Sequence, residues 1–192
     1  MTQRRNFWMR WRVRTGYPVA VIFLVLTAPT WRSILIGGAI AILGTAIRAA
    51  ASGHLRKYEE LATTGPYGRT RNPLYFGSAC LALGFAIAGD SWIAGLLVVA
   101  YFTVFYWAVM RNEESDLRDR FGAAFEEYAA RVPLFFPRLI GASGSATGIA
   151  LPRDGFSWAQ YRRNREYKAL LGTLAGLGVM CVRMWIRRKY GL

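Results

Sequence analysis

The stretch that decides the fold is residues 74–110, which read LYFGSACLALGFAIAGDSWIAGLLVVAYFTVFYWAVM. It is almost wholly apolar, and its main polar interruption is Gly89-Asp90-Ser91 near the middle. Each half approaches the length of a membrane crossing, because a helix of about 20 apolar residues spans the hydrocarbon core. The stretch therefore predicts a transmembrane hairpin whose two ends return to the same side of the bilayer.

A polar segment flanks the hairpin on each side. The first polar segment is residues 61–77, which read GPYGRTRNPLYFG from position 65 onward. The second polar segment is residues 112–138, which begin with Asn112, Glu113 and Glu114. Because the hairpin crosses the membrane twice, the two segments must meet on one side of it. Their Arg, Asn, Tyr and Glu side chains are expected to build one pocket at the membrane surface.

The composition indicates a single integral membrane domain, residues 1–192. Hydrophobic residues make up 54% of the chain and the mean hydropathy is +0.20, which is too apolar for an ordinary soluble domain. The formal net charge of +14 does not indicate a nucleic-acid partner, because Arg and Lys cluster at the ends of the apolar runs. Membrane lipids with anionic headgroups are the expected partners of these cations.

Metal and disulfide chemistry are not indicated by the sequence. Cys80 and Cys181 both lie within apolar stretches, and His54 is the only histidine. These residues do not supply the ligand count of a zinc site or the pattern of a disulfide framework. We therefore expect no metal cofactor, and we expect His54 to be a polar residue at the membrane interface.

The apolar runs predict an all-α bundle of about five transmembrane helices. The first four spans fall within residues 15–111, and the expected spans are residues 17–30, 34–51, 75–88, 92–110 and 169–186. Arg48, near the end of the second run, is expected to snorkel to the lipid headgroups. The last run has basic residues at both ends, so the charge rule does not decide whether it crosses. We prefer a fifth span, with Arg183 snorkelling, to a helix that lies in the interface.

Charge asymmetry predicts the orientation of the bundle. The loops that hold the two polar segments carry positive charge, whereas the turn at Asp90 carries none. Under the positive-inside rule, the polar segments and the amino terminus face the cytoplasm. The expected location is therefore the bacterial inner membrane, as a multi-pass protein with its site on the cytoplasmic side.

The second polar segment is expected to contain an amphipathic helix at residues 113–131. Its apolar positions recur at helical spacing and are Leu117, Phe121, Phe125 and Tyr128. Residues 132–137 are apolar and bounded by proline, a pattern more typical of a covering flap than of a helix. A Gly/Ser-rich linker is expected at residues 139–156, and a C-terminal helix at residues 157–192.

Two motifs in the polar segments resemble those of a known enzyme family. The first is LxxxGPYxxxRNPxYxG from Leu61 to Gly77, and the second is EExxLxxxFGxxxxxYxxxVPxxxP from Glu113 to Pro137. Their order and spacing are similar to those of the isoprenylcysteine carboxyl methyltransferase and phospholipid methyltransferase superfamily of membrane enzymes. The resemblance covers about residues 48–138.

The resemblance implies an enzyme that uses S-adenosylmethionine as methyl donor and releases S-adenosylhomocysteine. It implies that Glu113 lies near the reacting centre and, with Glu114, looks like the paired glutamate of the phospholipid enzymes. Residues 132–137 would cover the cofactor. The positions that would line the cofactor site are Leu61, Ala62, Tyr67, Asn72, Pro73, Leu74, Tyr75 and Glu114.

This sequence departs from the prenylcysteine enzymes at two positions. Asn72 stands where those enzymes typically have a histidine between Arg and Pro, and Val109 stands where they carry an arginine four residues before the glutamate. The second difference argues against recognition of a prenylcysteine carboxylate, although Arg111 is close by. A carboxylate, a thiol, or a lipid or small-molecule amine remain open as the acceptor.

Methyl transfer from a sulfonium also suits these residues on physical grounds. The methyl group is already activated, so the enzyme must mainly align donor and acceptor and exclude water. Tyr67 and Tyr75 offer aromatic faces to a cation, and Glu113 offers a carboxylate to the cation or to an acceptor proton. The predicted function is therefore methyl transfer to a lipophilic acceptor drawn from the membrane.

The alternative from another class is a non-catalytic membrane protein, either a small transporter subunit or a scaffold. In that case the polar segments only join helices. A transporter is expected to place polar groups or broken helices near the middle of the membrane, and the apolar runs show little of that. Binding of S-adenosylmethionine separates the two interpretations.

Overall fold

The computed structural model describes residues 2–56, 60–138 and 155–191. These residues form helices joined by short loops, and no strand occurs among them. The helices are α1 (Thr2–Leu26), α2 (Trp31–Gly53), η1 (Gly65–Gly68), α3 (Pro73–Ala88), α4 (Trp92–Phe121), α5 (Ala123–Arg131), α6 (Trp158–Arg163) and α7 (Tyr167–Tyr190). The prediction of an all-α bundle is confirmed, and the predicted linker at residues 139–156 lies almost wholly outside the described residues.

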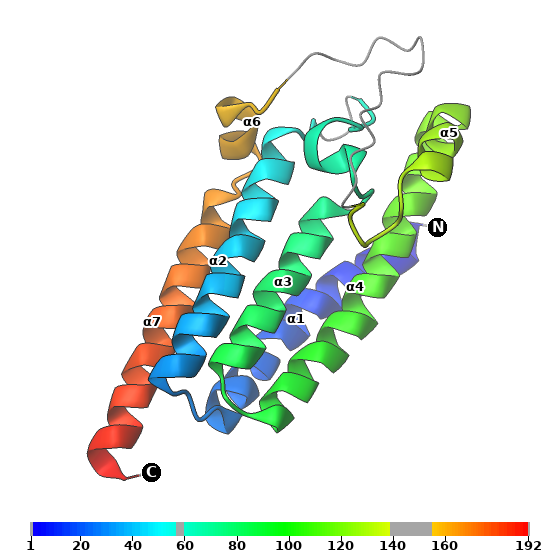
Figure 1. Ribbon diagram of the computed structural model, residues 1–192. Coiled ribbons are helices and arrows are strands. Elements are labelled where there is room, and N and C mark those ends of the chain that lie inside the picture. Colours follow the sequence, from blue (N-terminus) through cyan, green and yellow to red (C-terminus); the bar gives the residue numbers. More distant parts are fainter. Residues whose placement is uncertain (1, 57–59, 139–154, 192) are drawn as a thin grey trace.

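The long helices run side by side, and the short helices gather at one end of the bundle. Figure 1 shows α2, α3, α4 and α7 roughly parallel to one another, with η1, α5 and α6 at one end. The opposite end holds the α1–α2 loop, the turn between α3 and α4, and the C-terminus. The end that carries η1, α5 and α6 is called the polar end below.

Three helices are long and apolar enough to cross a membrane, namely α2, α4 and α7. The other two predicted spans fall on shorter apolar helices, which are residues 14–26 within α1 and the whole of α3. α7 covers the predicted fifth span at residues 169–186, and it runs the height of the bundle beside α2 (Figure 1). Its residues are mostly exposed, as expected for a helix that faces lipid.

The helix starts follow from local chemistry. Thr30 and Ser33 form a reciprocal capping box at the start of α2, and the Ser91 hydroxyl accepts a hydrogen bond from Ala94 N at the start of α4. α3 begins with Pro73, which needs no partner for its missing N–H in the first turn. The starts of α3 at Pro73 and of α4 after Ser91 thus each have a local signal, and the hairpin turn lies between the two helices at Gly89 and Asp90.

The predicted separate helix at residues 113–131 is wrong in its boundaries. α4 continues without a break from Trp92 to Phe121, and α5 begins only after Gly122. No glycine or proline separates the apolar part of α4 from its charged part, so the helix simply extends beyond the membrane. Gly122 has φ of +51°, a conformation that glycine adopts without strain, and it therefore ends α4.

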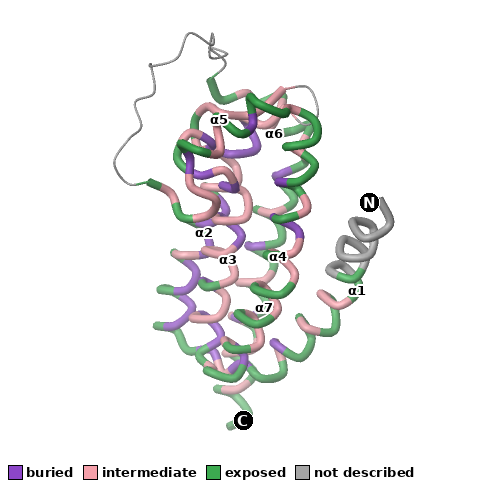
Figure 2. Tube along the Cα trace, turned by 90° about the vertical axis from the view of Figure 1, so that its right-hand side faces the viewer, coloured by how far each residue is buried: buried purple, intermediate pink, exposed green. Residues whose placement is uncertain are grey.

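α2 and α3 form the closest helix pair in the fold. A side-chain carbon at Gly84 would lie 2.5 Å from Ala41 N, and one at Gly44 would lie 2.6 Å from Gly77 O. Small residues on facing positions let the two backbones touch, which stabilises helix pairs in membranes through packing. Figure 2 shows buried residues concentrated along these two helices.

The end of α1 is held by a basic residue of α7. Arg183 Nε donates to Thr27 O at 3.0 Å, and Arg183 Nη2 donates to Val25 O at 2.7 Å. The last carbonyls of a helix lack partners within it, so these bonds satisfy them. Arg183 was expected to snorkel to headgroups, but it instead fastens α7 to α1.

Candidate functional site

The two polar segments meet at the polar end of the bundle, as the sequence predicted. Backbone bonds join Arg71 N to Pro133 O at 2.9 Å and Arg138 N to Arg69 O at 3.0 Å. Side chains of the first segment also bond to the flap at residues 132–137. The two shortest of these bonds are Thr70 Oγ1 to Phe135 O at 2.9 Å and Asn72 Nδ2 to Leu134 O at 3.0 Å.

A buried ion pair lies beneath this junction. Arg71 Nη1 is 2.5 Å from Glu114 Oε1, and the Glu114 side chain is only 8% exposed. Arg111, which is mostly exposed, approaches the other oxygen of Glu114 at 3.4 Å. Arg71 Nε and Glu114 Oε1 make no well-directed hydrogen bond within the described part of the chain, so charge holds this pair together.

Two tyrosines, the buried Tyr67 and the partly buried Tyr128, link η1 to α5. Tyr128 Oη donates to Tyr67 O at 2.7 Å. Burial raises the pKa of both phenols far above the ordinary tyrosine value, so both are neutral at physiological pH. The Glu113 carboxylate is the next cause of the raised pKa of Tyr67. The predicted catalytic carboxylate therefore adds to the effect of burial on the pKa of Tyr67.

The other residues predicted for the cofactor site cluster at the start of α3. Asn72 is the buried N-cap of α3, and its amide holds the flap rather than the helix. Pro73 is buried in the first turn. Leu74 O accepts a bond from Ser78 Oγ at 2.9 Å, and the Tyr75 ring packs edge-on against Tyr106 of α4 with centroids 5.6 Å apart.

A cavity of about 290 Å³ opens beside η1, between the end of α2 and the chain that leads to α6. Its walls include Leu61 and Ala62, which were predicted to line the cofactor site. The other predicted cofactor residues are not on its walls. η1, which runs from Gly65 to Gly68, is the piece of chain between the cavity and the junction of the polar segments. It follows Thr64 on the cavity wall and precedes Arg69, which bonds to Arg138 at the junction.

His54 lies at the cavity wall. Its Nδ1 is 2.8 Å from Ala50 O, and Phe156 packs edge-on against its ring with centroids 6.2 Å apart. Gly65 allows this placement, because a side-chain carbon there would lie 2.6 Å from His54 Nε2. The φ of Gly65 is +58°, which also favours glycine.

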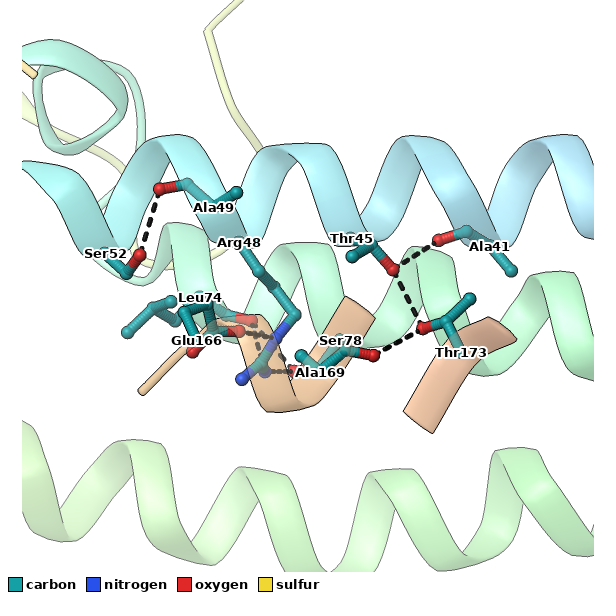
Figure 3. Close-up of polar contacts among 10 residues, drawn as sticks. All are labelled: Ala41, Thr45, Arg48, Ala49, Ser52, Leu74, Ser78, Glu166, Ala169 and Thr173. Carbon is teal, nitrogen blue, oxygen red and sulfur yellow. Dashed lines mark hydrogen bonds and ion pairs between the residues drawn. The ribbon is translucent and has the colours of Figure 1, made fainter. Parts of the chain in front are cut away.

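Arg48 does not snorkel to headgroups as predicted, but turns into the bundle. Arg48 Nε donates to Glu166 Oε1 at 2.5 Å, and Nη1 donates to Ser78 Oγ and, at 3.5 Å, to Leu74 O. Figure 3 shows these groups together between α2, α3 and the start of α7. Sequence reasoning missed Glu166 because it lies 118 positions from Arg48 and belongs to no recognised motif.

Among the described residues, no three His, Cys, Asp or Glu side chains come together as a group that could hold a metal ion. Two glutamates of the site are instead paired with cations, Glu114 with Arg71 and Glu166 with Arg48. The described part of the site therefore consists of paired charges, buried phenols and one cavity.

Comparison with known proteins identifies the relatives of this chain. A family model for phospholipid methyltransferases, part of the isoprenylcysteine carboxyl methyltransferase-like superfamily, matches residues 19–124. The match extends the resemblance seen in the sequence motifs into α1, and it stops short of α6 and α7. No solved structure matches the chain.

Two curated relatives carry names from metal resistance. The nickel-cobalt-cadmium resistance protein NccN of Alcaligenes xylosoxydans xylosoxydans is 33% identical over 138 residues, which cover 67% of this chain and 63% of that protein. The cobalt-zinc-cadmium resistance protein CzcN of Cupriavidus metallidurans is 38% identical over 92 residues, which cover 48% of this chain and 42% of that protein. The matches thus span less than two thirds of either relative.

Proposed function

Because the chain belongs to the phospholipid methyltransferase family, we propose that it transfers a methyl group from S-adenosylmethionine to a lipophilic acceptor. The observation that carries this proposal is the meeting of the two polar segments beside a cavity at one end of an apolar bundle. The polar end would face the cytoplasm of a bacterial inner membrane, and residues 1–192 would act as one domain. S-adenosylhomocysteine would be the product.

The residues of the cavity fit the donor. A volume of about 290 Å³ is near the lower end of the range for small-molecule sites, which begins at about 300 Å³. Arg56 and Glu60, 3.3 Å apart, offer both signs of charge to a zwitterionic amino acid group. The hydroxyls of Thr63 and Thr64 suit a ribose, and the His54 ring suits a base. When bound, S-adenosylmethionine supplies an electrophilic methyl group on a positively charged sulfur.

The residues at the junction would do the remaining work. The Glu113 carboxylate, which raises the pKa of Tyr67, would compensate positive charge or accept a proton from the acceptor, and Tyr67 would offer an aromatic face. Glu114 would keep Arg71 in place, and the flap at residues 132–137 would exclude water. The start of α3, from Asn72 to Tyr75, would line the junction next to the flap rather than the cavity itself.

The acceptor would enter sideways from the bilayer. Its tail would lie between helices and only its reactive head would reach the junction, so affinity should rise by about 0.8 kcal/mol for each buried methylene. Val109 provides no cation for a prenylcysteine carboxylate. We therefore expect an uncharged or amine-bearing lipophile to be a better acceptor than a farnesylcysteine compound.

The names of the two relatives favour a second candidate, a non-catalytic membrane component of a metal-resistance system. In that case the polar segments would serve only to join and brace helices. This candidate predicts no binding of S-adenosylmethionine, whereas methyl transfer requires it.

Calorimetry on the purified protein in detergent separates the two candidates. We expect S-adenosylmethionine and S-adenosylhomocysteine to bind with comparable affinity, because they share the adenosine and amino acid groups. Glu113→Gln should lower methyl transfer more than it lowers folding yield, and Tyr67→Ala should chiefly weaken binding. Glu126→Gln, which alters an exposed ion pair on α5, is the matched control. No heat and no thermal shift with either ligand would reject methyl transfer.

A further inference from the structure

We propose that Glu166, at the start of α7, is a positioning residue that acts through Arg48 on the first turn of α3. This makes the C-terminal helices part of the site, although they lie outside the family match at residues 19–124. The role of Glu166 in a methyl-transfer site rests on the proposed function, whereas its effect on α3 can be measured without it. It assigns a role to a carboxylate that no recognised motif contains.

The geometry links Glu166 to α3 through a single side chain. The Arg48 and Glu166 side chains are only 23% and 9% exposed, so each charge depends on the other for compensation. From this pair, Arg48 Nη1 reaches Ser78 Oγ and Leu74 O, while Ser78 Oγ itself donates to Leu74 O. One guanidinium therefore holds a carboxylate of α7 and two groups of α3 at once (Figure 3).

The path of Arg48 depends on a glycine of α3. A side-chain carbon at Gly77 would lie 2.7 Å from Arg48 Cγ, so the stem of the arginine crosses the helix where no side chain stands. This path carries the guanidinium from α2 to the first two turns of α3. Arginine suits the task because its planar group offers several donors in fixed directions.

Glu166 is not needed merely to keep α7 beside α2. Thr45 Oγ1 and Thr173 Oγ1 lie 3.0 Å apart in a buried contact between those helices. Asn164 Nδ2 donates to Ser52 O at 2.9 Å and to Leu55 O at 3.0 Å, which satisfies carbonyls at the end of α2. These bonds fasten the C-terminal helices independently, so the particular effect of the Glu166 carboxylate falls on Arg48.

The pair also lies beside the residues proposed for the site. Leu74, whose carbonyl receives Arg48, directly precedes Tyr75 and follows Pro73. The charges of Glu166 and Arg48 act on Tyr67 in opposite directions, since the carboxylate raises and the guanidinium lowers its pKa. A shift of Arg48 would therefore change both the backbone of α3 and the charge around Tyr67.

The test compares Glu166→Gln with Thr173→Val, a variant that removes a buried bond from the same helix pair without touching Arg48. Two properties are measured in detergent, the affinity for S-adenosylhomocysteine by calorimetry and the hydrogen exchange of residues 72–79 by mass spectrometry. We expect Glu166→Gln to weaken binding about tenfold, which corresponds to about 1.4 kcal/mol, and to speed exchange in α3. Thr173→Val should lower the unfolding temperature but leave both properties unchanged.

If both variants change affinity and exchange equally, Glu166 contributes only to packing and the proposal is wrong. The proposal is also wrong if Glu166→Gln leaves both affinity and exchange as in the unaltered protein. If the unaltered protein does not bind S-adenosylhomocysteine, methyl transfer fails, while the exchange comparison still decides the role of Glu166. Should Glu166→Gln not fold, Glu166→Asp replaces it. The shorter carboxylate keeps its charge but retracts from Arg48, so it should retain the unfolding temperature and still speed exchange in α3.

Discussion

Arg71 and Glu114 form an ion pair that ties the loop before α3 to the part of α4 that extends beyond its apolar stretch, with Nη1 and Oε1 2.5 Å apart. The hairpin of α3 and α4 is closed by a short turn at its far end, and Tyr75 of α3 packs against Tyr106 of α4. The ion pair and the bonds to the flap hold α3 and α4 in their relative position at the polar end. A site built from both polar segments depends on this arrangement.

Removal of the Glu114 carboxylate should destabilise the protein more than removal of an exposed one. Glu114→Ala leaves Arg71 buried without a counter-charge, and the loss of one partner from a buried pair costs about 3–5 kcal/mol. The measurement is unfolding in detergent mixtures. The control is Glu126→Ala, because the pair of Glu126 with Arg118 is about half exposed on both sides and solvent screens it. If both variants lose the same free energy of unfolding, the charge of Arg71 must be compensated by another group or by solvent when Glu114 is absent.

Alkaline pH should unfold the protein as its buried phenols ionise. The folded-state pKa values of Tyr67 and Tyr128 lie above the unfolded value of about 10. Above that pH the unfolded state binds fewer protons than the folded state, so stability is fully present below about pH 10 and falls as the pH rises further. Absorbance of tyrosinate should therefore rise cooperatively with loss of helix. Exposed tyrosines such as Tyr17 and Tyr190 also contribute absorbance, so the contribution of Tyr67 and Tyr128 is taken as the difference from a variant with phenylalanine at both positions. A difference signal that rises before any helix is lost would contradict the prediction.

The sequence predicted the architecture well because its signals are local. The apolar runs became helices, two of them with a side-chain cap at their start, and the turn at Asp90 placed the two polar segments at the same end of the bundle. The meeting of those segments followed from topology alone, without knowledge of any contact. The boundary error at α4 arose because an amphipathic pattern shows which residues share an apolar helix face. It does not show whether these residues start a new helix or continue the one before them.

The roles of individual charges could not be predicted in the same way. Arg48 and Arg183 each look like a cation at the end of an apolar run, a pattern typical of snorkelling. Their actual partners, Glu166 and the carbonyls at Val25 and Thr27, lie more than a hundred residues away in sequence. Nothing in the local pattern distinguishes a cation that faces headgroups from one that faces another helix.

The contact between α2 and α3 should tolerate no side chain at Gly84. An added carbon would press on the backbone of α2, 2.5 Å from Ala41 N, and overpacking of this kind costs about 1–3 kcal/mol. Gly172 on α7 is the matched control, because no atom lies near its added carbon. Gly172→Ala should be neutral or stabilising by up to about 1 kcal/mol, since glycine weakens a helix interior. Comparable unfolding temperatures for the two alanine variants would refute the close contact.

Membrane labelling should place both polar segments on one side and the C-terminus on the other. Figure 1 shows the C-terminal end of α7 at the end of the bundle opposite η1 and α5. In a variant without the two native cysteines, single cysteines at Arg69 and Asp119 should react with an impermeant maleimide from the same side. Cysteines at Asp90 and Tyr190 should react only from the opposite side, because α7 crosses the full height of the bundle. Labelling of Tyr190 from the side of Arg69 would show that α7 lies in the interface, and labelling of Arg69 and Asp119 from different sides would separate the two halves of the site.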